Sequence, residues 1–265
     1  MVRYFEKFHL KQFIPKKPIR FGYKVCSSNT PREYLLDFEV YQGKSENEYT
    51  HIEKLVGKSA APLLKMVENF PEEIKSLPFH FYVINLFTTF KLLSHMQQLG
   101  YGATGTLREN RIPNSCPLAS NKVLKKFPRG HTKSIINKPH GVLLCKWVDN
   151  SVVVACSNTH GISPITEVSR YSFTSKTQVQ VPRPAMLSVY NQGMGGTDWL
   201  DQNVNLYRIQ IRNRKWYWPL VIWMLNVALQ SSWILHRHAG NDISHLDFRR
   251  GIALTYLKKF KTSQP

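Results

Sequence analysis

The sequence predicts an α/β fold: a mixed sheet with flanking helices, interrupted by a β-rich insertion. Segments with the apolar runs or alternation of strands occur among segments with helical spacing. A strand–helix–strand order also follows a hairpin and a helix, which is typical of a sheet with helices on its faces. The 265 residues suit one large domain or a core that carries an inserted module.

The first part of the chain predicts a hairpin and a helix. In the second strand of the hairpin we expect Leu36, Phe38 and Val40 to share one face. Ser59 is a suitable N-cap for the helix. The expected elements are strands at 19–27 and 34–41, a turn at 29–32 and a helix at 59–70.

The next segment predicts two strands with a helix between them. Phe79–Ile84 is a continuous apolar run, which suits a strand covered on both faces. It leads directly into a helix expected at 87–99, which Gly100 ends, and a short strand is expected at 101–107.

From residue 105 to residue 190 the chain becomes strongly basic, with twelve Lys and Arg against three acids. Strands are expected at 142–148 and 151–156, joined by an Asp149–Asn150 turn, so we interpret this part as an inserted module. Helices are expected beyond it: one with an apolar stripe at 198–209, a buried core helix at 219–236 and an amphipathic helix at 248–260.

The charge balance predicts a polyanionic partner. Thirty-six Lys and Arg against 17 Asp and Glu give a net charge of +19 and a pI near 9.9. A membrane partner is not expected, because the apolar stretch Pro219–Leu229 contains Asn226 and is shorter than the ~20 residues of a span. The N-terminus has no apolar signal region, and the four cysteines form no CxxC pair, which favours reduced thiols in an intracellular protein.

Three local patterns suggest chemistry but have simpler explanations. Gly57-Lys-Ser resembles the end of a phosphate-binding loop, but Ile52 stands where that loop needs glycine. Asp149 is better explained as a turn residue than as a catalytic carboxylate. Three histidines near a helix end lack a ligand partner at metal-binding spacing and are interpreted as surface residues: His236, His238 and His245.

Two further patterns leave the choice open. Gly193–Asp198 supplies a flexible entry to a helix, which then presents Asp198 and Asp201 on one face. Spacing alone favours helix capping over divalent-metal binding. Arg208, Arg212, Arg214 and Lys215 precede the aromatic run Trp216–Trp218, and phosphate contact and an ordinary solvated loop are equally good explanations of this cluster.

Several strings, taken together and in order, resemble the piggyBac transposases and their domesticated derivatives. They cover nearly the whole chain. The strings are LKQFIPKKP at 10–18, FEVYQG at 38–43, NLFTT at 85–89, GATGTLRENR at 102–111, QVPRP at 180–184, YNQGMGGTD at 190–198 and KWYWP at 215–219.

The resemblance implies an RNase H-like core interrupted by the β-rich insertion. The expected segments are 1–107 for the first, N-terminally truncated part of the core, 108–184 for the basic insertion, and 185–265 for the helical remainder. Transposases of this family use three aspartates to hold two Mg²⁺ ions. The resemblance places the first before Met1, the second at Ile84 and the third at Asp198, near Asp201. Because Ile84 offers no oxygen, we expect the site not to assemble.

We therefore expect a nuclear protein without catalysis or cofactor that binds double-stranded DNA, with a second copy of the chain as a further candidate partner. One alternative is a residual Mg²⁺-dependent transposase or nuclease that uses Asp37, Glu39 or Asp149 as a replacement carboxylate. Another is a decayed, poorly folded fragment. The candidate DNA-binding residues are Lys122, Lys125, Lys126, Arg129, Arg208, Arg212, Arg214 and Lys215.

Overall fold

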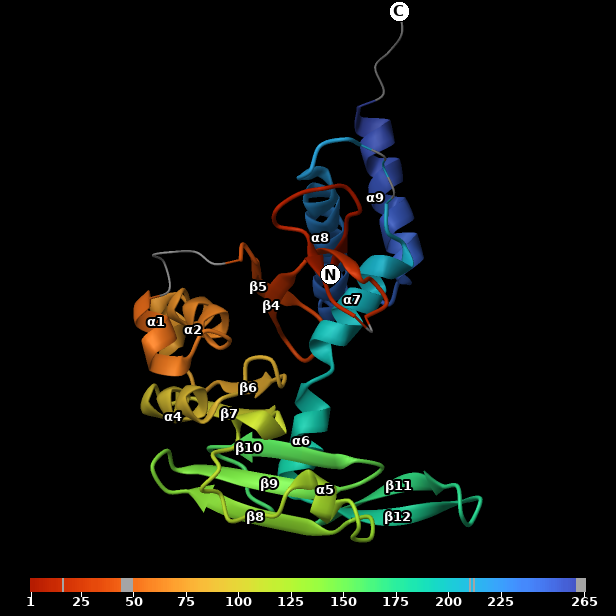
Figure 1. The fold of residues 1–265 in the computed structure, drawn as a ribbon. Helices are drawn as coiled ribbons and strands as arrows, with labels where there is room; N and C mark the ends of the chain where they lie inside the picture. The colour runs from red at the N-terminus through yellow and green to blue at the C-terminus, as the bar shows by residue number, and fades with distance from the viewer. Residues whose placement is uncertain (16, 44–49, 210, 212, 261–265) are drawn as a thin grey trace, which may run out of the picture. The chain divides into compact units, whose positions relative to one another are not determined.

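By its internal contacts the chain divides into two units. One comprises Met1–Lys44 with Gly195–Pro265, and the other comprises Ser45–Met194. The computed structural model describes residues 1–15, 17–43, 50–209, 211 and 213–260. Most elements of each unit are labelled in Figure 1.

The unit of residues 45–194 is built on a five-stranded mixed sheet. The strand order is β6-β7-β10-β9-β8; β6 and β7 are parallel and every other pair is antiparallel. The mixed sheet with helices confirms the α/β class. The strands are β6 (His80–Val83), β7 (Gly102–Thr106), β8 (Thr132–Asn137), β9 (Val142–Val148) and β10 (Val152–Ser157).

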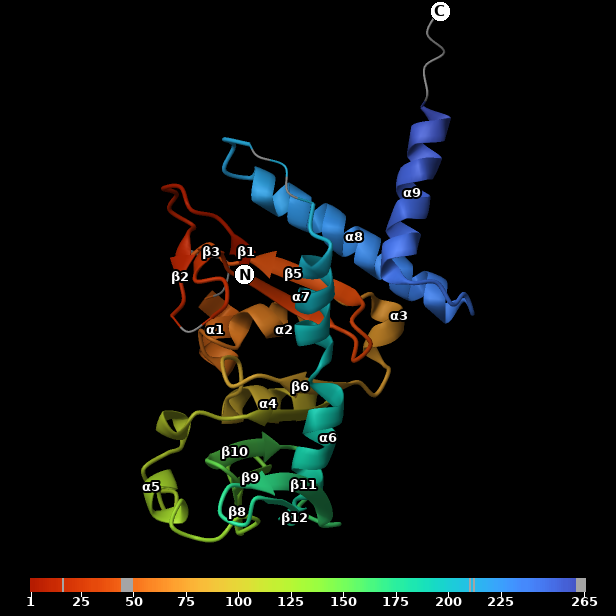
Figure 2. The ribbon, with the colours of Figure 1, turned by 90° about the vertical axis from the view of Figure 1, so that its right-hand side faces the viewer.

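Both faces of this sheet are covered, and because side chains alternate along a strand, β9 contributes to two cores. On β9, Val142 and Leu144 join a core built with α4 (Phe90–Gln98). The alternate residue Trp147 joins a second core with α6 (Ala185–Gly193), and its indole N–H donates to the Pro182 carbonyl oxygen at 2.7 Å. Figure 2 shows α4 and α6 beside the sheet.

Short helices and a second hairpin complete this unit. β11 and β12 pair with each other as a two-stranded antiparallel sheet. The elements are α1 (Thr50–Val56), α2 (Ala61–Glu68), α3 (Glu72–Lys75), the 3₁₀ helix η1 (Glu109–Arg111), α5 (Asn121–Leu124), β11 (Thr166–Ser172) and β12 (Thr177–Arg183).

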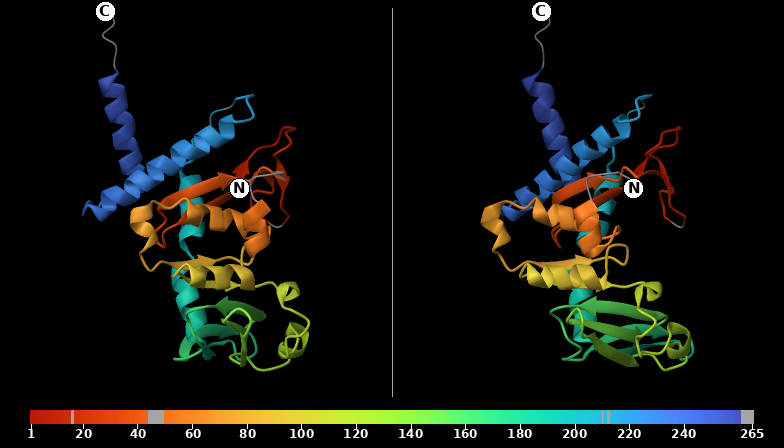
Figure 3. Two further views of the ribbon diagram at one scale, coloured as in Figure 1. Left: turned by 90° about the vertical axis from the view of Figure 1, so that its left-hand side faces the viewer. Right: turned by 60° about the vertical axis from the view of Figure 1, so that its left-hand side comes forward.

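The other unit packs three helices with two small sheets. Its core joins Val2 and Tyr23 from the first sheet with Leu200 and Trp223 from the helices. Phe38, in the hairpin of residues 25–40, meets Trp223 of the helix Trp218–His238 edge to face at 5.0 Å. Figure 3 shows this helix crossing the hairpin. The elements are β1 (Val2–Arg3), β2 (Gln12–Phe13), β3 (Phe21–Tyr23), the hairpin β4 (Val25–Asn29) and β5 (Leu35–Val40), α7 (Gly196–Leu206), α8 (Trp218–His238) and α9 (His245–Lys259).

Glu33 links the β4–β5 turn to two helices of the same unit. Its carboxylate accepts from Asn203 of α7 at 2.6 Å and from the buried Gln230 of α8 at 3.1 Å.

The turn expected at 29–32 is confirmed by backbone hydrogen bonds between the two strands of this hairpin. A bulge at Ser28/Asn29 shifts the register, and Leu36 is exposed instead of sharing a buried face with Phe38.

Helix boundaries differ from expectation where side chains cap the backbone. The helix expected from Phe87 begins at Phe90, because the Thr89 hydroxyl accepts from the Leu92 amide at 3.0 Å as an N-cap. The helix α1 was not expected. The Asp149–Asn150 turn between β9 and β10 is confirmed.

The two C-terminal helices are less buried than expected. In α8 the side chains of Leu225 and Leu235 are exposed, so the helix is not buried on all sides. In α9 the single buried residue is His245, and Leu254 and Leu257 are exposed. Apolar composition alone does not show whether a partner element covers every side of a helix.

Helix α8 agrees closely with the helix expected at 219–236. The expectation of no membrane partner rested on the apolar stretch 219–229 alone, but the whole helix is long and apolar enough, by length and composition alone, to cross a membrane. Its buried Asn226 donates to the Ile222 carbonyl oxygen at 2.7 Å, and its buried Gln230 bonds Glu33. These buried polar contacts within the unit favour a helix packed in protein.

The two units do not coincide with the three segments expected from the sequence. The expected boundary at residue 107 falls between β7 and β10, which are neighbours in one sheet. Pairing between strands so distant in sequence leaves no local signal, so composition alone suggested a separate module.

Three of the four free cysteines, Cys26, Cys145 and Cys156, are buried, and burial raises the pKa of their thiols.

Candidate functional site

Ile84 directly follows β6, at the position where the resemblance places a catalytic aspartate. Its side chain is 40% exposed, although the sequence suggested a buried strand end. The preceding Val83 is buried and faces the core. The Ile84 side chain therefore lies at the surface, immediately beyond the buried part of the strand.

The backbone around Ile84 is held by Thr88. The buried Thr88 hydroxyl lies 3.0 Å from the Ile84 carbonyl oxygen, to which it donates, and 3.3 Å from the Val83 carbonyl oxygen. A Cβ at Gly105 would collide with this hydroxyl, so the neighbouring strand β7 can lie this close to Thr88 only because residue 105 is glycine. The strand end is thus a tightly packed turn.

Arg111 fixes the loop that follows Ile84. Its guanidinium donates to the carbonyl oxygens of Asn85 at 3.1 Å, Leu86 at 2.9 Å and Thr88 at 2.7 Å. Burial, and then the nearby Arg108, lowers the pKa of Arg111. Residue-type reasoning did not single out Arg111, although it ends the string GATGTLRENR.

The glycines of Gly193–Asp198 serve close packing rather than flexibility. Gly193 ends α6 directly against the ring of Tyr82, and Gly196 begins α7 against the carbonyl oxygen of Thr30. Neither glycine has a positive φ. These contacts account for the two glycines without a special backbone conformation, and the expected helix that carries Asp198 and Asp201 is confirmed.

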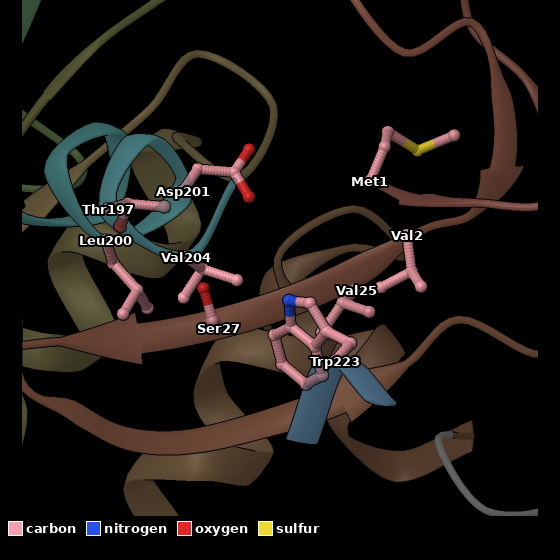
Figure 4. A pocket seen from close by; sticks show the side chains of 9 residues that line it. All are labelled: Met1, Val2, Val25, Ser27, Thr197, Leu200, Asp201, Val204 and Trp223. Carbon is pink, nitrogen blue, oxygen red and sulfur yellow. The ribbon is translucent and has the colours of Figure 1, made fainter. Parts of the chain in front are cut away.

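Asp198 and Asp201 are both exposed on α7. Asp198 lies in the first turn, where a carboxylate stabilises the helix dipole, but makes no N-cap hydrogen bond. One turn later, Asp201 lines a small, largely apolar pocket of the same unit (Figure 4). The pocket is lined by Met1, Val2, Val25, Ser27, Thr197, Leu200, Asp201, Val204 and Trp223.

Arg208 lies in the electrostatic environment of Asp201. Burial, and then Arg3, lowers the pKa of Arg208, and Asp201 opposes this shift. The Arg208 side chain is half-buried in its own unit, so only part of it is accessible to a ligand. This position is a weaker candidate for phosphate contact than a fully exposed arginine.

The donors present do not fit the Mg²⁺ pair that the resemblance implies. Ile84 has no oxygen, and the described residues contain no group of three His, Cys, Asp or Glu that could hold a metal. Asp149, a candidate replacement ligand, forms salt bridges through its carboxylate oxygens with Arg170 Nε at 2.9 Å and Arg129 Nε at 3.4 Å. Asp37 accepts from the amide of Phe38 at 2.7 Å, and Glu39 lies in the same strand, β5.

The candidate DNA-binding residues differ in exposure and in the contacts that they make within the protein. Lys122, Lys125 and Lys126 are exposed on and just after α5, and no carboxylate among the described residues pairs with them. Arg129, in contrast, binds Asp149, the Tyr171 carbonyl oxygen and the Asn150 side chain. Its contacts hold the fold.

The second basic cluster is exposed at Arg214 and Lys215, and Arg212 lies outside the described residues. Trp216 stacks on Phe8 at 4.4 Å, and its carbonyl oxygen accepts from the buried Tyr23 hydroxyl at 2.9 Å. This anchor places the cluster at the entry to α8.

The histidines do not form a surface group as expected. His245 is 6% exposed, stacks on Trp233 at 4.8 Å and leaves both ring nitrogens without a hydrogen-bond partner. Burial, and then Arg249, lowers its pKa to about 4. His236 is half-buried and His238 is exposed.

Comparisons with known proteins agree on one family. A family model described as Transposase IS4 matches residues 1–233. The chain is 40% identical over 262 residues to human (Homo sapiens) PiggyBac transposable element-derived protein 3 and 36% identical over 260 residues to human PiggyBac transposable element-derived protein 2. Each match covers 97% of this chain and 43% of the relative, so the chain spans less than half of their length.

A solved structure supports the same fold. The chain matches a cryo-EM structure of the piggyBac transposase synaptic complex with hairpin DNA, with a TM-score of 0.71 and 20% identity. The match covers 98% of this chain and 52% of that one. From the family model and the two human relatives, the chain belongs to the piggyBac transposase family.

Proposed function

We propose that the chain is a transposase-derived protein that binds double-stranded DNA in the nucleus and has lost catalysis. The observation that carries the loss of catalysis is Ile84. By the resemblance it stands at the family's second aspartate position, and an isoleucine side chain cannot ligate Mg²⁺. The loop after it, residues 85–89, contains no Asp or Glu that could replace it, and Arg111 holds this loop through three carbonyl oxygens.

The proposal includes an RNase H-like core, whose parallel strands β6 and β7 share one sheet with the strands of the basic insertion at 108–184. The parallel β6–β7 pair inside an otherwise antiparallel sheet and the TM-score of 0.71 support it. The proposed protein needs no cofactor for binding.

DNA binding rests on charge and on its placement. The chain carries +19, and the exposed Lys122, Lys125 and Lys126 lack carboxylate partners among the described residues. The structural neighbour is named as a complex with hairpin DNA. Nuclear localisation is proposed on the same grounds, because a protein derived from a DNA transposase meets its polyanion there.

The test measures duplex affinity against salt for three variants with equal charge change. Lys125→Glu/Lys126→Glu and Arg214→Glu/Lys215→Glu alter the proposed contacts, and Lys258→Glu/Lys259→Glu alters exposed charges of α9. Each lost phosphate contact should flatten the slope of log K against log salt by about 0.9. We expect flatter slopes in the first two variants than in the third. Equal slopes in all three would refute the assignment of these clusters to DNA.

The alternative activities have their own tests. Plasmid nicking with Mg²⁺ or Mn²⁺ that is lost in Asp198→Ala would favour a residual nuclease. The contacts of Asp149 with Arg129 and Arg170 argue against that residue as a replacement ligand. Non-cooperative unfolding would favour a decayed fragment. We expect a cooperative transition, because buried clusters such as that of Leu64, Leu92 and Leu93 form the cores of both units.

A further inference from the structure

Two phenylalanine rings lie side by side on the surface of the β2–β3 hairpin. Phe13 and Phe21 are direct cross-strand partners, and their ring centroids are 4.8 Å apart. Phe13 is 57% exposed and Phe21 is 41% exposed. Their planes are tilted by 32° to each other, so the exposed pair, held at fixed register, forms an apolar platform of two inclined rings that a ligand can reach.

Positive charge surrounds this platform. Lys11 places its ammonium 5.8 Å from the Phe21 ring centroid and is held there by a 3.0 Å hydrogen bond to the Phe5 carbonyl oxygen. Arg20 and Lys17 are exposed in the loop of the hairpin. Residues 1–24 contain seven Lys and Arg against one acid, Glu6. The ligand that fits combines flat apolar faces with repeated negative charge.

Unpaired nucleotides have this combination, and duplex DNA does not. In a duplex the faces of the bases are stacked on each other, so only the phosphates would meet this surface. In a single strand each base has a free face that stacks on an aromatic ring while the phosphates contact Lys and Arg. An acidic protein segment would satisfy the charges but would leave the two rings without stacking partners.

We propose that the Phe13–Phe21 platform, with Lys11 and Arg20, binds the unstacked bases of single-stranded nucleic acid. This inference rests on the proposed function in one respect, that the chain acts on nucleic acid. It adds a second substrate form, read by base stacking through residues other than the lysines of α5, Arg214 and Lys215.

The test compares the anisotropy of short fluorescent probes titrated with the whole chain. The probes are oligothymidylate, an abasic deoxyribose oligomer of the same length, oligouridylate and a duplex. We expect oligothymidylate to bind more tightly than the abasic oligomer, because both carry the same phosphates and only the former has bases. The oligouridylate arm distinguishes RNA from DNA as the source of the single strand.

The variant is Phe13→Ala/Phe21→Ala. Its affinity for oligothymidylate should fall by about 5- to 150-fold, the usual effect of removing stacking on one base, with the affinity for the abasic oligomer unchanged. Phe13→Leu/Phe21→Leu keeps apolar bulk but not a flat face, so it should lose the same preference even if the alanine variant unfolds. Phe173→Ala is the matched control, because Phe173 is 83% exposed on the other unit and should leave binding unchanged.

The outcomes separate this inference from the proposed function. Normal duplex affinity with equal binding of oligothymidylate and the abasic oligomer would overturn the platform and leave duplex binding intact. Loss of duplex affinity in the lysine variants, with the base preference preserved, would support both. An equal loss in Phe173→Ala would also overturn the platform, because any exposed ring would then contribute.

Discussion

Gly193, the last residue of α6, lies directly against the aromatic ring of Tyr82, which is on strand β6. A Cβ at this glycine would collide with the ring carbons. The contact joins a helix and a strand that are more than a hundred residues apart in the sequence, inside one unit. It explains a glycine whose backbone conformation would admit any residue.

Gly193→Ala should therefore destabilise its unit. Because the ring of Tyr82 must shift to admit a methyl group, we expect the free energy of unfolding to fall by about 1–3 kcal/mol. Urea unfolding, followed by circular dichroism, measures it. Gly251→Ala is the control: Gly251 lies in α9 with open space around it, so this variant should gain about 0.5–1 kcal/mol from helix propensity. Equal effects in both variants would contradict the packing argument.

Arg111→Met should loosen the loop after Ile84. The change keeps much of the side-chain volume but leaves the carbonyl oxygens of Asn85, Leu86 and Thr88 without their common donor. We expect a loss of about 2–3 kcal/mol. Hydrogen exchange of the amides from Asn85 to Thr89 should accelerate relative to those of β9. Arg108→Met, at an exposed position with one long hydrogen bond, should change both measurements little.

Local signals in the sequence predicted those elements whose own residues specify them. The β4–β5 hairpin follows from its turn residues, and β9 and β10 follow from their apolar runs and the Asp149–Asn150 turn. The helix that carries Asp198 and Asp201 was also predicted from its own spacing. In each case the deciding interactions lie within a few residues.

The features that the sequence did not predict depend on distant partners. The pairing of β7 with β10 removed the expected boundary at residue 107, and the ring of Tyr82 gave Gly193 a different role. Ile84 ends an apolar run but is 40% exposed, while His245 is covered by Trp233. Burial of one side chain by another element has no signature in the residue itself.

His245 should make stability depend on pH below neutrality. Its pKa is lowered to about 4 by burial and by Arg249, whereas in the unfolded chain its pKa is near the ordinary histidine value of 6.5. Between these values the unfolded state binds the proton and the folded state does not, so stability falls as pH decreases from 6.5 towards 4. His245→Phe, which keeps a ring on Trp233, should remove about one proton from the measured linkage.

The control for this pH dependence is His238→Phe, at an exposed position. It should leave the linkage unchanged. His80, whose pKa is lowered to about 4 by burial and by His160, should supply the pH dependence that remains in His245→Phe. A pH profile of unfolding that is identical in wild type and His245→Phe would show that the buried ring does not resist protonation.

Ile84→Asp should fold nearly as well as the wild type. The side chain is 40% exposed, so a carboxylate there keeps contact with water and we expect a change within about 1 kcal/mol. The neighbouring Val83 is 1% exposed, and Val83→Asp should cost about 3 kcal/mol or more. The two variants place the same group on adjacent residues, so urea unfolding isolates the effect of burial. A large loss in both would restore the buried strand end that the sequence suggested.

The same Ile84→Asp variant should remain unable to cut DNA. A pair of Mg²⁺ ions needs several oxygen ligands at about 2.1 Å, arranged so that the ions hold both the attacking and the leaving oxygen. One added carboxylate supplies one ligand residue, while no group of three His, Cys, Asp or Glu among the described residues could complete the set. Incubation of supercoiled plasmid with Mg²⁺ or Mn²⁺ should therefore show no nicking above that of Ile84→Asn, which adds an uncharged side chain of the same size. Nicking that appears in Ile84→Asp and disappears when Asp198→Ala is added would show that the other ligands are already in place. In that case the chain would be an enzyme that lacks one carboxylate, and the non-catalytic assignment would be wrong.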